Sequence, residues 1–125
     1  MRLLLDSHVL LWWLADDPAL GPEARSLIAN PDNEVLVSAA SAWEISIKRG
    51  LGKLEAPPDV AGTIEQLGFM ELPITATDGE RAGALEPHHR DPFDRMLVAQ
   101  AERAGATIVT QDPVFALYGV ATLTA

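Results

Sequence analysis

The chain has 125 residues, which fits a single domain over residues 1–125 with an apolar core of its own. It contains no cysteine, so disulfide frameworks and thiolate zinc sites are excluded. Eighteen acidic against nine basic residues give a net charge of −9, which excludes a protein that holds nucleic acid by phosphate neutralisation alone. Two interpretations stay open: the protein avoids nucleic acid, or a metal ion supplies the positive charge at the contact.

Membrane and export segments are not expected. The longest apolar run, Val9–Ala15, is much shorter than the roughly 20 residues that a membrane helix needs. Asp6 interrupts the N-terminal apolar run where a signal peptide would continue. We therefore expect a cytoplasmic protein.

Short apolar runs alternate along the chain with segments that carry helix caps. Strands are predicted at 3–5, 34–37, 69–72 and 107–110, with 120–123 as a candidate fifth. Helices are predicted at 9–14 behind Asp6 or Ser7, at 22–29, from Ser38 or Ser41 to 49, at 57–68, from Thr75 or Thr77 to 85, and at 91–104. Strands that are apolar on both faces are typical of a parallel sheet covered on both sides. The predicted fold class is therefore α/β, a three-layer sandwich around a mainly parallel sheet of four to five strands.

Four acidic residues lie where such a sheet binds ligands, beyond the carboxyl ends of its strands. Asp6 ends the first strand, and Glu44 lies one and a half turns into the helix after the second. Asp94 lies in the first turn of the helix before the fourth strand, and Asp112 follows that strand. Carboxylates crowded in a partly dry pocket repel one another until a cation binds, and Mg²⁺ suits oxygen ligands. A site of this kind favours hydrolysis of a phosphodiester.

Each acid also has a purely structural interpretation. Asp6 is a good cap for the first helix, and Ser41–Glu44 has the spacing of a capping box. Asp94 would be the third helical residue behind an Asp91 N-cap, and Asp112 before Pro113 is a common turn or cap. The shared site is favoured because it accounts for all four acids at once.

The remaining functional side chain types give weaker expectations. The tryptophans are expected to pack in the core or at an interface, with base stacking as the alternative: Trp12, Trp13 and Trp43. The histidines lack metal-motif spacing and are expected to be structural or on the surface, so no histidine base is expected: His8, His88 and His89.

The basic residues are few. One basic cluster is expected to compensate a helix dipole, with an RNA backbone contact as the alternative: Lys48, Arg49 and Lys53. The first and last of these are the only lysines, and no dedicated basic partner is expected for the four acids. Arg95 either pairs with an acid or contacts substrate.

Four segments together carry a family pattern. They are LLDSHVLLWWL at 4–14, SAASAWEISIK at 38–48, HRDPFDRMLVAQA at 89–101, and Thr110–Pro113 with Phe115 and Tyr118–Val120. In this order they resemble the motifs of PIN-domain ribonucleases, specifically VapC-type toxins of toxin–antitoxin pairs. The resemblance covers nearly the whole chain, and the third segment is its most specific part.

The resemblance implies a Mg²⁺ site, with Mn²⁺ as a substitute, whose acidic core is Asp6, Glu44 and Asp94. Asp112 would be a fourth, more peripheral or water-mediated acid. Three hydroxyl residues would orient the carboxylates: Ser7, Ser38 and Thr110. The family cleaves RNA to leave a 5′-phosphate and a 3′-hydroxyl, forms homodimers, and is silenced by a cognate antitoxin that places a basic side chain near the acidic pocket.

Two departures from the family pattern stand out. Ser7 occupies a position where threonine is common, which keeps the hydroxyl. Gln111 stands where a charged residue is frequent, and this weakens the expectation that Asp112 contacts metal directly.

Two other functions stay open at this stage. A receiver-like phosphoacceptor domain would have paired acids after its first strand, an aspartate after its third and a lysine near its last. Here Asp6 is a single acid, the third strand ends at Leu72-Pro73, and no lysine follows Lys53. A catalytically idle interaction module, whose acidic cleft binds a basic segment, is compatible with all four acids.

Overall fold

The leucines of the first strand point alternately into two apolar clusters, one on each face of the sheet. The computed structural model describes all 125 residues. In strand β1 (Arg2–Leu5), Leu3 and Leu5 pack on one face of the sheet, and Leu4 packs on the other. All three are fully buried, as expected for a central strand whose side chains alternate between two covered faces.

The sheet has five parallel strands in the order β3-β2-β1-β4-β5. The other strands are β2 (Glu34–Ser38), β3 (Met70–Leu72), β4 (Thr107–Thr110) and β5 (Thr122–Thr124). The helices are α1 (Ser7–Ala15), α2 (Pro22–Ala29), α3 (Ala39–Gly50), α4 (Val60–Gln66), α5 (Ala76–Ala84) and α6 (Pro92–Ala104), with a 3₁₀ helix η1 (Pro113–Tyr118). The α/β sandwich expected from the sequence is confirmed.

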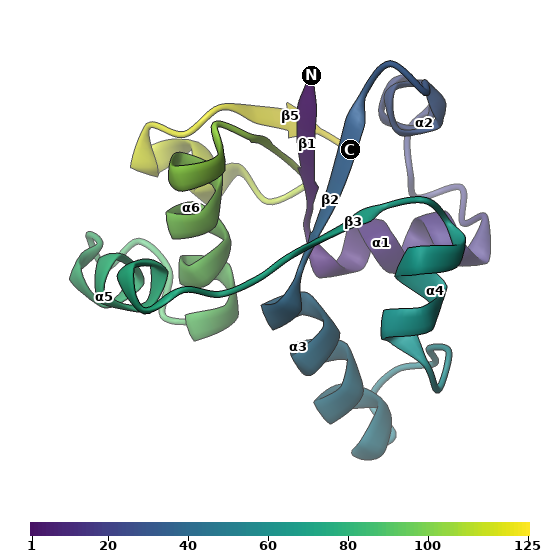
Figure 1. Ribbon diagram of the computed structural model, residues 1–125, viewed down its shortest axis with the longest axis horizontal. Helices are drawn as coiled ribbons and strands as arrows, with labels where there is room; N and C mark the ends of the chain where they lie inside the picture. The colour runs from purple at the N-terminus through teal and green to yellow at the C-terminus, as the bar shows by residue number, and fades with distance from the viewer.

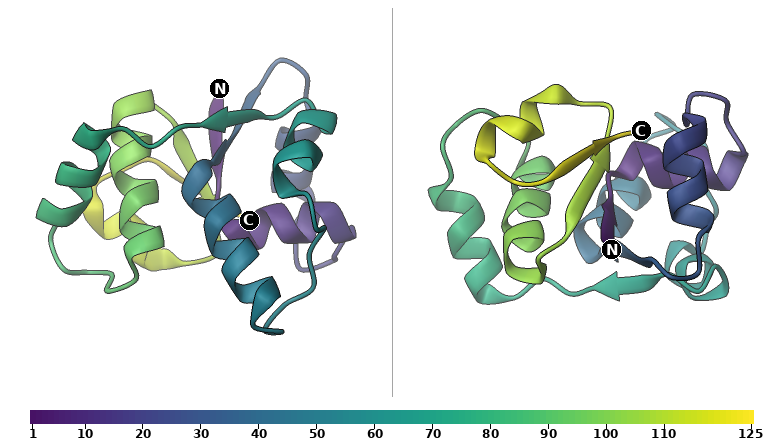
Figure 2. Two further views of the ribbon diagram at one scale, coloured as in Figure 1. Left: turned by 60° about the horizontal axis from the view of Figure 1, so that its bottom comes forward. Right: turned by 90° about the horizontal axis from the view of Figure 1, so that it is seen from above.

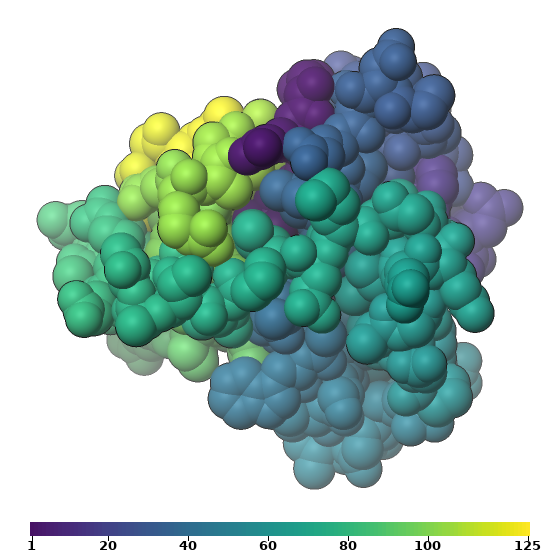
Figure 3. Space-filling model, viewed as in Figure 1, coloured from purple at the N-terminus to yellow at the C-terminus, as the bar shows by residue number.

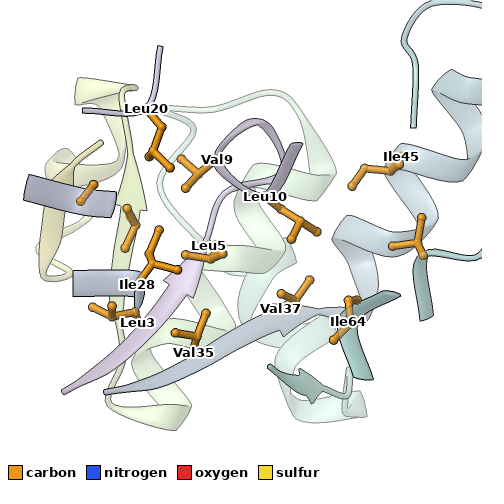
Figure 4. Packing of buried hydrophobic residues seen from close by; sticks show 13 residues of the cluster. Leu3, Leu5, Val9, Leu10, Leu20, Ile28, Val35, Val37, Ile45 and Ile64 are labelled. Atoms are coloured by element: carbon orange, nitrogen blue, oxygen red, sulfur yellow. The ribbon is translucent and has the colours of Figure 1, made fainter. Parts of the chain in front are cut away.

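Helices cover both faces of the sheet. Figure 2 shows α1 and α2 on one side of β1, and α5 and α6 on the other. The first face packs against residues of α1, α2, α3 and α4, including Val9, Ile28, Ile45 and Ile64, as Figure 4 shows from close by. The second face packs against α6 and η1, where Phe115 is fully buried. In the space-filling view, the segment from β3 to α5 lies across the front of the molecule (Figure 3).

The strand order places a topological switch between β1 and β4. From β1 the chain builds outward through β2 and β3, and it then returns to the other side of β1 to add β4 and β5 (Figure 1). In open α/β sheets the crevice beyond the carboxyl ends at such a switch is the usual ligand site. Asp6 follows β1 and Asp112 follows β4, so both lie at this point. The receiver-like alternative is wrong, because that fold has the strand order 2-1-3-4-5.

Most element bounds agree with the sequence expectations to within one or two residues. The helix over Pro22–Ala29 and the strand over Thr107–Thr110 have the expected bounds. Ser38 caps α3, so Ser41 as the cap is wrong, and Glu44 takes no part in a capping box. Thr75, rather than Thr77, caps α5. None of the helices is long and apolar enough to cross a membrane.

Three elements differ from expectation. Helix α4 begins at Val60 behind its cap Asp59, three residues after the expected start at 57. The fifth strand lies at Thr122–Thr124, two residues later than the start of the expected segment, because pairing with β4 sets its register. The 3₁₀ helix η1 was not expected. Asp112 caps it through Val114 N–H, and Phe115 anchors it in the core.

Candidate functional site

The Thr110 hydroxyl forms hydrogen bonds with the carboxylate of Asp6 and with the backbone of Asp112, two of the four acids predicted from the sequence. The backbone N–H of Asp6 donates to Val109 O at 3.1 Å, which holds the ends of β1 and β4 side by side. Thr110 Oγ1 donates to Asp6 Oδ2 at 2.8 Å and accepts from the Asp112 backbone N–H at 3.0 Å. Thr110 therefore orients a carboxylate, as the resemblance implied.

Asp6 is a part-buried carboxylate that stays ionised. It caps α1 by accepting from His8 N–H at 3.3 Å, and the His8 Nδ1 lies 3.9 Å from Asp6 Oδ1. Burial acts to raise the pKa of Asp6, but hydrogen bonding with His8 and Thr110 outweighs burial and holds this pKa below its ordinary value. The structural interpretation of Asp6 as a helix cap is thus also true. A cap uses one lone pair of a carboxylate that has several.

Asp94 is the acid with the fewest partners, since its one ion-pair contact is with His89 Nε2, 4.0 Å from Oδ2. Its side chain is 24% exposed, lies in the first turn of α6 and accepts no hydrogen bond. Burial, and then the negative charges of Asp91 and Asp6, raise the pKa of Asp94 to about 7; His89 acts to lower this pKa, and Glu44 adds a smaller rise. The charges of Asp6 and Glu44 therefore act on Asp94, whereas the ligand atoms that lie within 4.8 Å of one another belong to His89, Asp94 and Asp112.

Glu44 is brought to the same region, but both of its oxygens are engaged. The residue is 6% exposed and sits on α3. Ser7 Oγ donates to Oε1 at 2.6 Å, and Lys48 Nζ donates to Oε2 at 2.9 Å. The expectation that the acids have no dedicated basic partner is therefore wrong for Glu44. The i, i+4 spacing of Glu44 and Lys48 on one helix was the signal for this ion pair.

The Asp112 carboxylate contacts His89, a histidine that we expected from the sequence to be structural or on the surface. His89 Nε2 lies 2.9 Å from Asp112 Oδ2 and 4.0 Å from Asp94 Oδ2. The His89 ring is 8% exposed and stacks on Tyr118, with ring centroids 5.5 Å apart. His8 and His88 are exposed, as expected. His89 instead faces two site acids, and its place at the start of the third family-like segment was the available signal.

The structure corrects some of the other expectations for this region and confirms others. Ser38 does not orient a carboxylate, because its hydroxyl donates to the buried Gln100. Arg95 pairs with no acid, since its guanidinium donates to backbone carbonyls, those of Ala82, Gly83, Leu85, Glu86 and His89. Trp43 is 63% exposed, so it is not a core residue, whereas Trp12 and Trp13 pack against the core. Asp91 caps α6 through Phe93 N–H, as expected.

The donor chemistry of this region fits a divalent cation. His89, Asp94 and Asp112 each offer one ligand atom, and these atoms lie within 4.8 Å of one another. Asp94 carries a carboxylate whose negative form its acidic neighbours disfavour. A divalent ion would remove that repulsion, and carboxylate oxygens are the ligands that hard cations prefer. Asp94 accepts no hydrogen bond, whereas each oxygen of Asp6 and of Glu44 accepts one and keeps a further lone pair.

Comparison with known proteins places the chain in a family. The model of the PIN domain matches residues 3–120. Ribonuclease VapC22 of Mycobacterium tuberculosis is 32% identical over 113 residues, which are 88% of this chain and 86% of that protein.

Solved structures agree on the fold. VapBC2 from Rickettsia felis, bound to a DNA fragment from its promoter, matches with a TM-score of 0.69 and 14% identity over 98% of both chains. A toxin–antitoxin complex from Klebsiella pneumoniae matches with a TM-score of 0.64 and 19% identity over 97% of this chain and 95% of that one. At these identities the two structures support the fold alone. The match to the PIN-domain model over most of the chain and the similarity to VapC22 together show that this chain belongs to the PIN-domain family, among the VapC-type ribonucleases.

Proposed function

We propose that this VapC-type chain is a metal-dependent endoribonuclease that acts as the toxin of a toxin–antitoxin pair. The observation that carries the proposal is the position of Asp94. Its carboxylate accepts no hydrogen bond, His89 Nε2 lies 4.0 Å away, and the negative charges of Asp91 and Asp6 disfavour its ionised form. A protein keeps such a group at a cost in stability, and functional sites are where such costs are usually found.

Three of the four acids accept hydrogen bonds at both oxygens, and Asp94 accepts none. Asp94 and Asp6 would hold the metal directly, with Thr110 fixing the orientation of Asp6. Asp112 would act from the edge of the site, because His89 and Val114 N–H already engage its oxygens. Glu44 would face the ion with the positive charge of Lys48 beside it, which weakens it as a ligand. All four add negative charge at the place where a cation is needed.

Mg²⁺ is the proposed ion, with Mn²⁺ as a substitute, because the free ligand atoms are carboxylate oxygens. A divalent ion neutralises phosphate charge and lowers the pKa of water, which is the chemistry that phosphodiester hydrolysis needs. The chain's own residues position the acids through Thr110, Ser7 and His89. The products would carry a 5′-phosphate and a 3′-hydroxyl.

An antitoxin partner follows from the same reasoning. The Rickettsia felis and Klebsiella pneumoniae proteins of this fold were solved as toxin–antitoxin assemblies. This chain has a net charge of −9 and a cluster of acids at one edge of its sheet, so a basic side chain of a partner would occupy the cluster in place of the metal. We further propose that it works as a homodimer of single-domain subunits in the cytoplasm.

A catalytically idle module that binds a basic segment is the second candidate, because the same acids would serve it. Turnover separates the two functions. Purified protein would be incubated with total RNA and Mg²⁺, with and without excess chelator, and fragment ends would be mapped. The nuclease proposal predicts Mg²⁺-dependent cleavage with 5′-phosphate ends and no cleavage by Asp94→Asn. Full activity in chelator, or equal activity of Asp94→Asn, would contradict it.

A further inference from the structure

Lys48 is a cation at an otherwise acidic site. Its Nζ lies 2.9 Å from Glu44 Oε2, one helical turn away on α3. Ser7 holds the other oxygen of Glu44 at 2.6 Å. Because Glu44 is only 6% exposed and is hydrogen-bonded to Ser7, its carboxylate holds the Lys48 ammonium group in a fixed position.

The charge of Lys48 also interacts with site residues other than Glu44. The hydrogen bond to Glu44 raises the pKa of Lys48, burial opposes this rise, and the charges of Asp91 and Asp94 add to it. The positive charge of Lys48 in turn acts to lower the pKa of His8, which sits beside Asp6. Lys48 is therefore within electrostatic reach of residues from α1, α3 and α6.

Two arginines near this region, Arg95 and Arg49, donate to backbone carbonyls. Arg95 donates to backbone carbonyls, and Arg49 Nε donates to Ala56 O at 3.1 Å. Arg103 pairs with Asp78 on the α5 side of the molecule. Of the lysines and arginines, Lys48 is the one that forms an ion pair with one of the four acids.

The Lys48 ammonium group has N–H donors that Glu44 does not use. It has three N–H donors, of which Glu44 takes one. The Lys48 side chain is 36% exposed, so its remaining donors can meet a ligand from solvent. A phosphodiester that approaches the acids is repelled by them, and a compact point charge at their edge offsets that repulsion.

We propose that Lys48 is a further substrate-contacting residue, whose ammonium group binds a non-bridging oxygen of the RNA phosphodiester at the acidic site. In this arrangement Glu44 and Ser7 are positioning residues that hold the ammonium in place, and Glu44 does not need to ligate the metal. The inference rests on the proposed nuclease function. No bond to Lys48 forms or breaks, because the group acts through charge and hydrogen bonding alone.

Cleavage kinetics test the role, with the other lysine as the matched control. Lys48→Met removes the charge, and Lys53→Met removes the same charge from an exposed loop residue. For Mg²⁺-dependent cleavage of total RNA, Lys48→Met is expected to lose about 100-fold in rate, as when one preorganised donor is removed. Lys48→Arg is expected to recover part of the loss, and Lys53→Met to stay within about twofold. Equal rates for Lys48→Met and wild type would overturn the inference.

Because Lys48→Met leaves the Glu44 carboxylate buried without its cation, a double variant keeps the test valid if the single one unfolds. In Glu44→Gln/Lys48→Met no buried charge remains unpaired, and the variant is expected to fold and still to be about 100-fold slower. A folded double variant with wild-type activity would contradict the proposal. If wild type itself cleaves no RNA, the proposed function has failed, and the kinetic comparison does not arise.

A binding measurement gives an independent readout. Since the chain has only two lysines, reductive ¹³C-methylation labels Lys48, Lys53 and the N-terminus, and the lysine signals are assigned with Lys48→Arg. Single-stranded phosphorothioate RNA of random sequence would then be titrated in Mg²⁺. The signal of Lys48 is expected to shift while that of Lys53 stays. No shift at Lys48, or an equal shift at Lys53, would show that the lysine only pairs with Glu44.

Discussion

The imidazole of His89 bridges two acids that lie 18 residues apart in the sequence, with Nε2 2.9 Å from Asp112 Oδ2 and 4.0 Å from Asp94 Oδ2. The same residue is fixed from its other side, because its backbone N–H donates to the Tyr118 hydroxyl at 2.7 Å and its ring stacks on Tyr118. A single buried side chain thus ties the start of α6 to the segment that carries Asp112. The orientation of the Asp112 carboxylate therefore depends on its contact with His89.

His89→Phe is predicted to preserve the stacking on Tyr118 and to lose the hydrogen bond to Asp112. Losing a residue that orients a site carboxylate typically costs 10–100-fold in activity, so we expect a rate about tenfold or more below wild type. The measurement is Mg²⁺-dependent RNA cleavage, with the thermal midpoint recorded in parallel. The control is His88→Phe, because His88 is exposed and contacts no acid. Unchanged cleavage by His89→Phe would show that Asp112 needs no such support.

Asp94→Asn is predicted to stabilise the metal-free protein at high pH. A carboxyl whose pKa is raised to about 7 in the folded state, against 3.8 as the ordinary value, stabilises the fold while it is protonated. That contribution is complete below about pH 4 and is lost as the pH rises through 7. At pH 8 the free energy of unfolding of the variant should therefore be about 1–3 kcal/mol larger than that of wild type. Denaturant melts at pH 4 and pH 8 check the result, and a gain that does not grow with pH would contradict it.

A second pH effect of the opposite sign is predicted at the α5–α6 contact. Asp78 is 2% exposed and accepts from Arg103 Nε at 2.7 Å. Its carboxylate also accepts from Thr75 N–H, which completes the capping box of α5. Burial acts to raise the pKa of Asp78, but hydrogen bonds from Arg103 and Thr75 outweigh it and lower this pKa.

Because its pKa is lowered, Asp78 contributes stability above pH 3.8, and the contribution is lost as the pH falls through the lowered value. Asp78→Asn is expected to cost about 2 kcal/mol at pH 7, and its difference from wild type should shrink in acid. Urea melts from pH 7 to pH 3 measure this. Glu80→Gln, an exposed change on the same helix, is the control and should have little effect.

Much of the fold was predictable because local signals and packing agree. Pro22 at the first helical position, and the four apolar or β-branched residues of Thr107–Thr110, define their elements with little help from the rest of the chain. The 3₁₀ helix η1 was not predictable in this way. Its formation depends on the cap at Asp112 and on the burial of Phe115 against α6, which are tertiary contacts.

The acids of the site were predictable, but their partners were not. Strand ends in an α/β sheet point to Asp6 and Asp112, and this inference needs only the alternation of elements. The partner of Asp112 lies 23 residues away at His89, and no periodicity relates the two. For Ser38 the expected role at the site was wrong. Its hydroxyl donates to the buried Gln100, a contact in the core that the sequence does not indicate.

Titration of Mn²⁺ into the purified protein at pH 7.5, followed by calorimetry, tests most directly whether the acids meet in order to hold a divalent ion. The account predicts saturable binding to wild type, loss of at least tenfold in affinity in Asp94→Asn, and wild-type affinity in Asp32→Asn, which removes a charge from an exposed loop. Equal affinity of wild type and Asp94→Asn, or no binding to wild type, would contradict it.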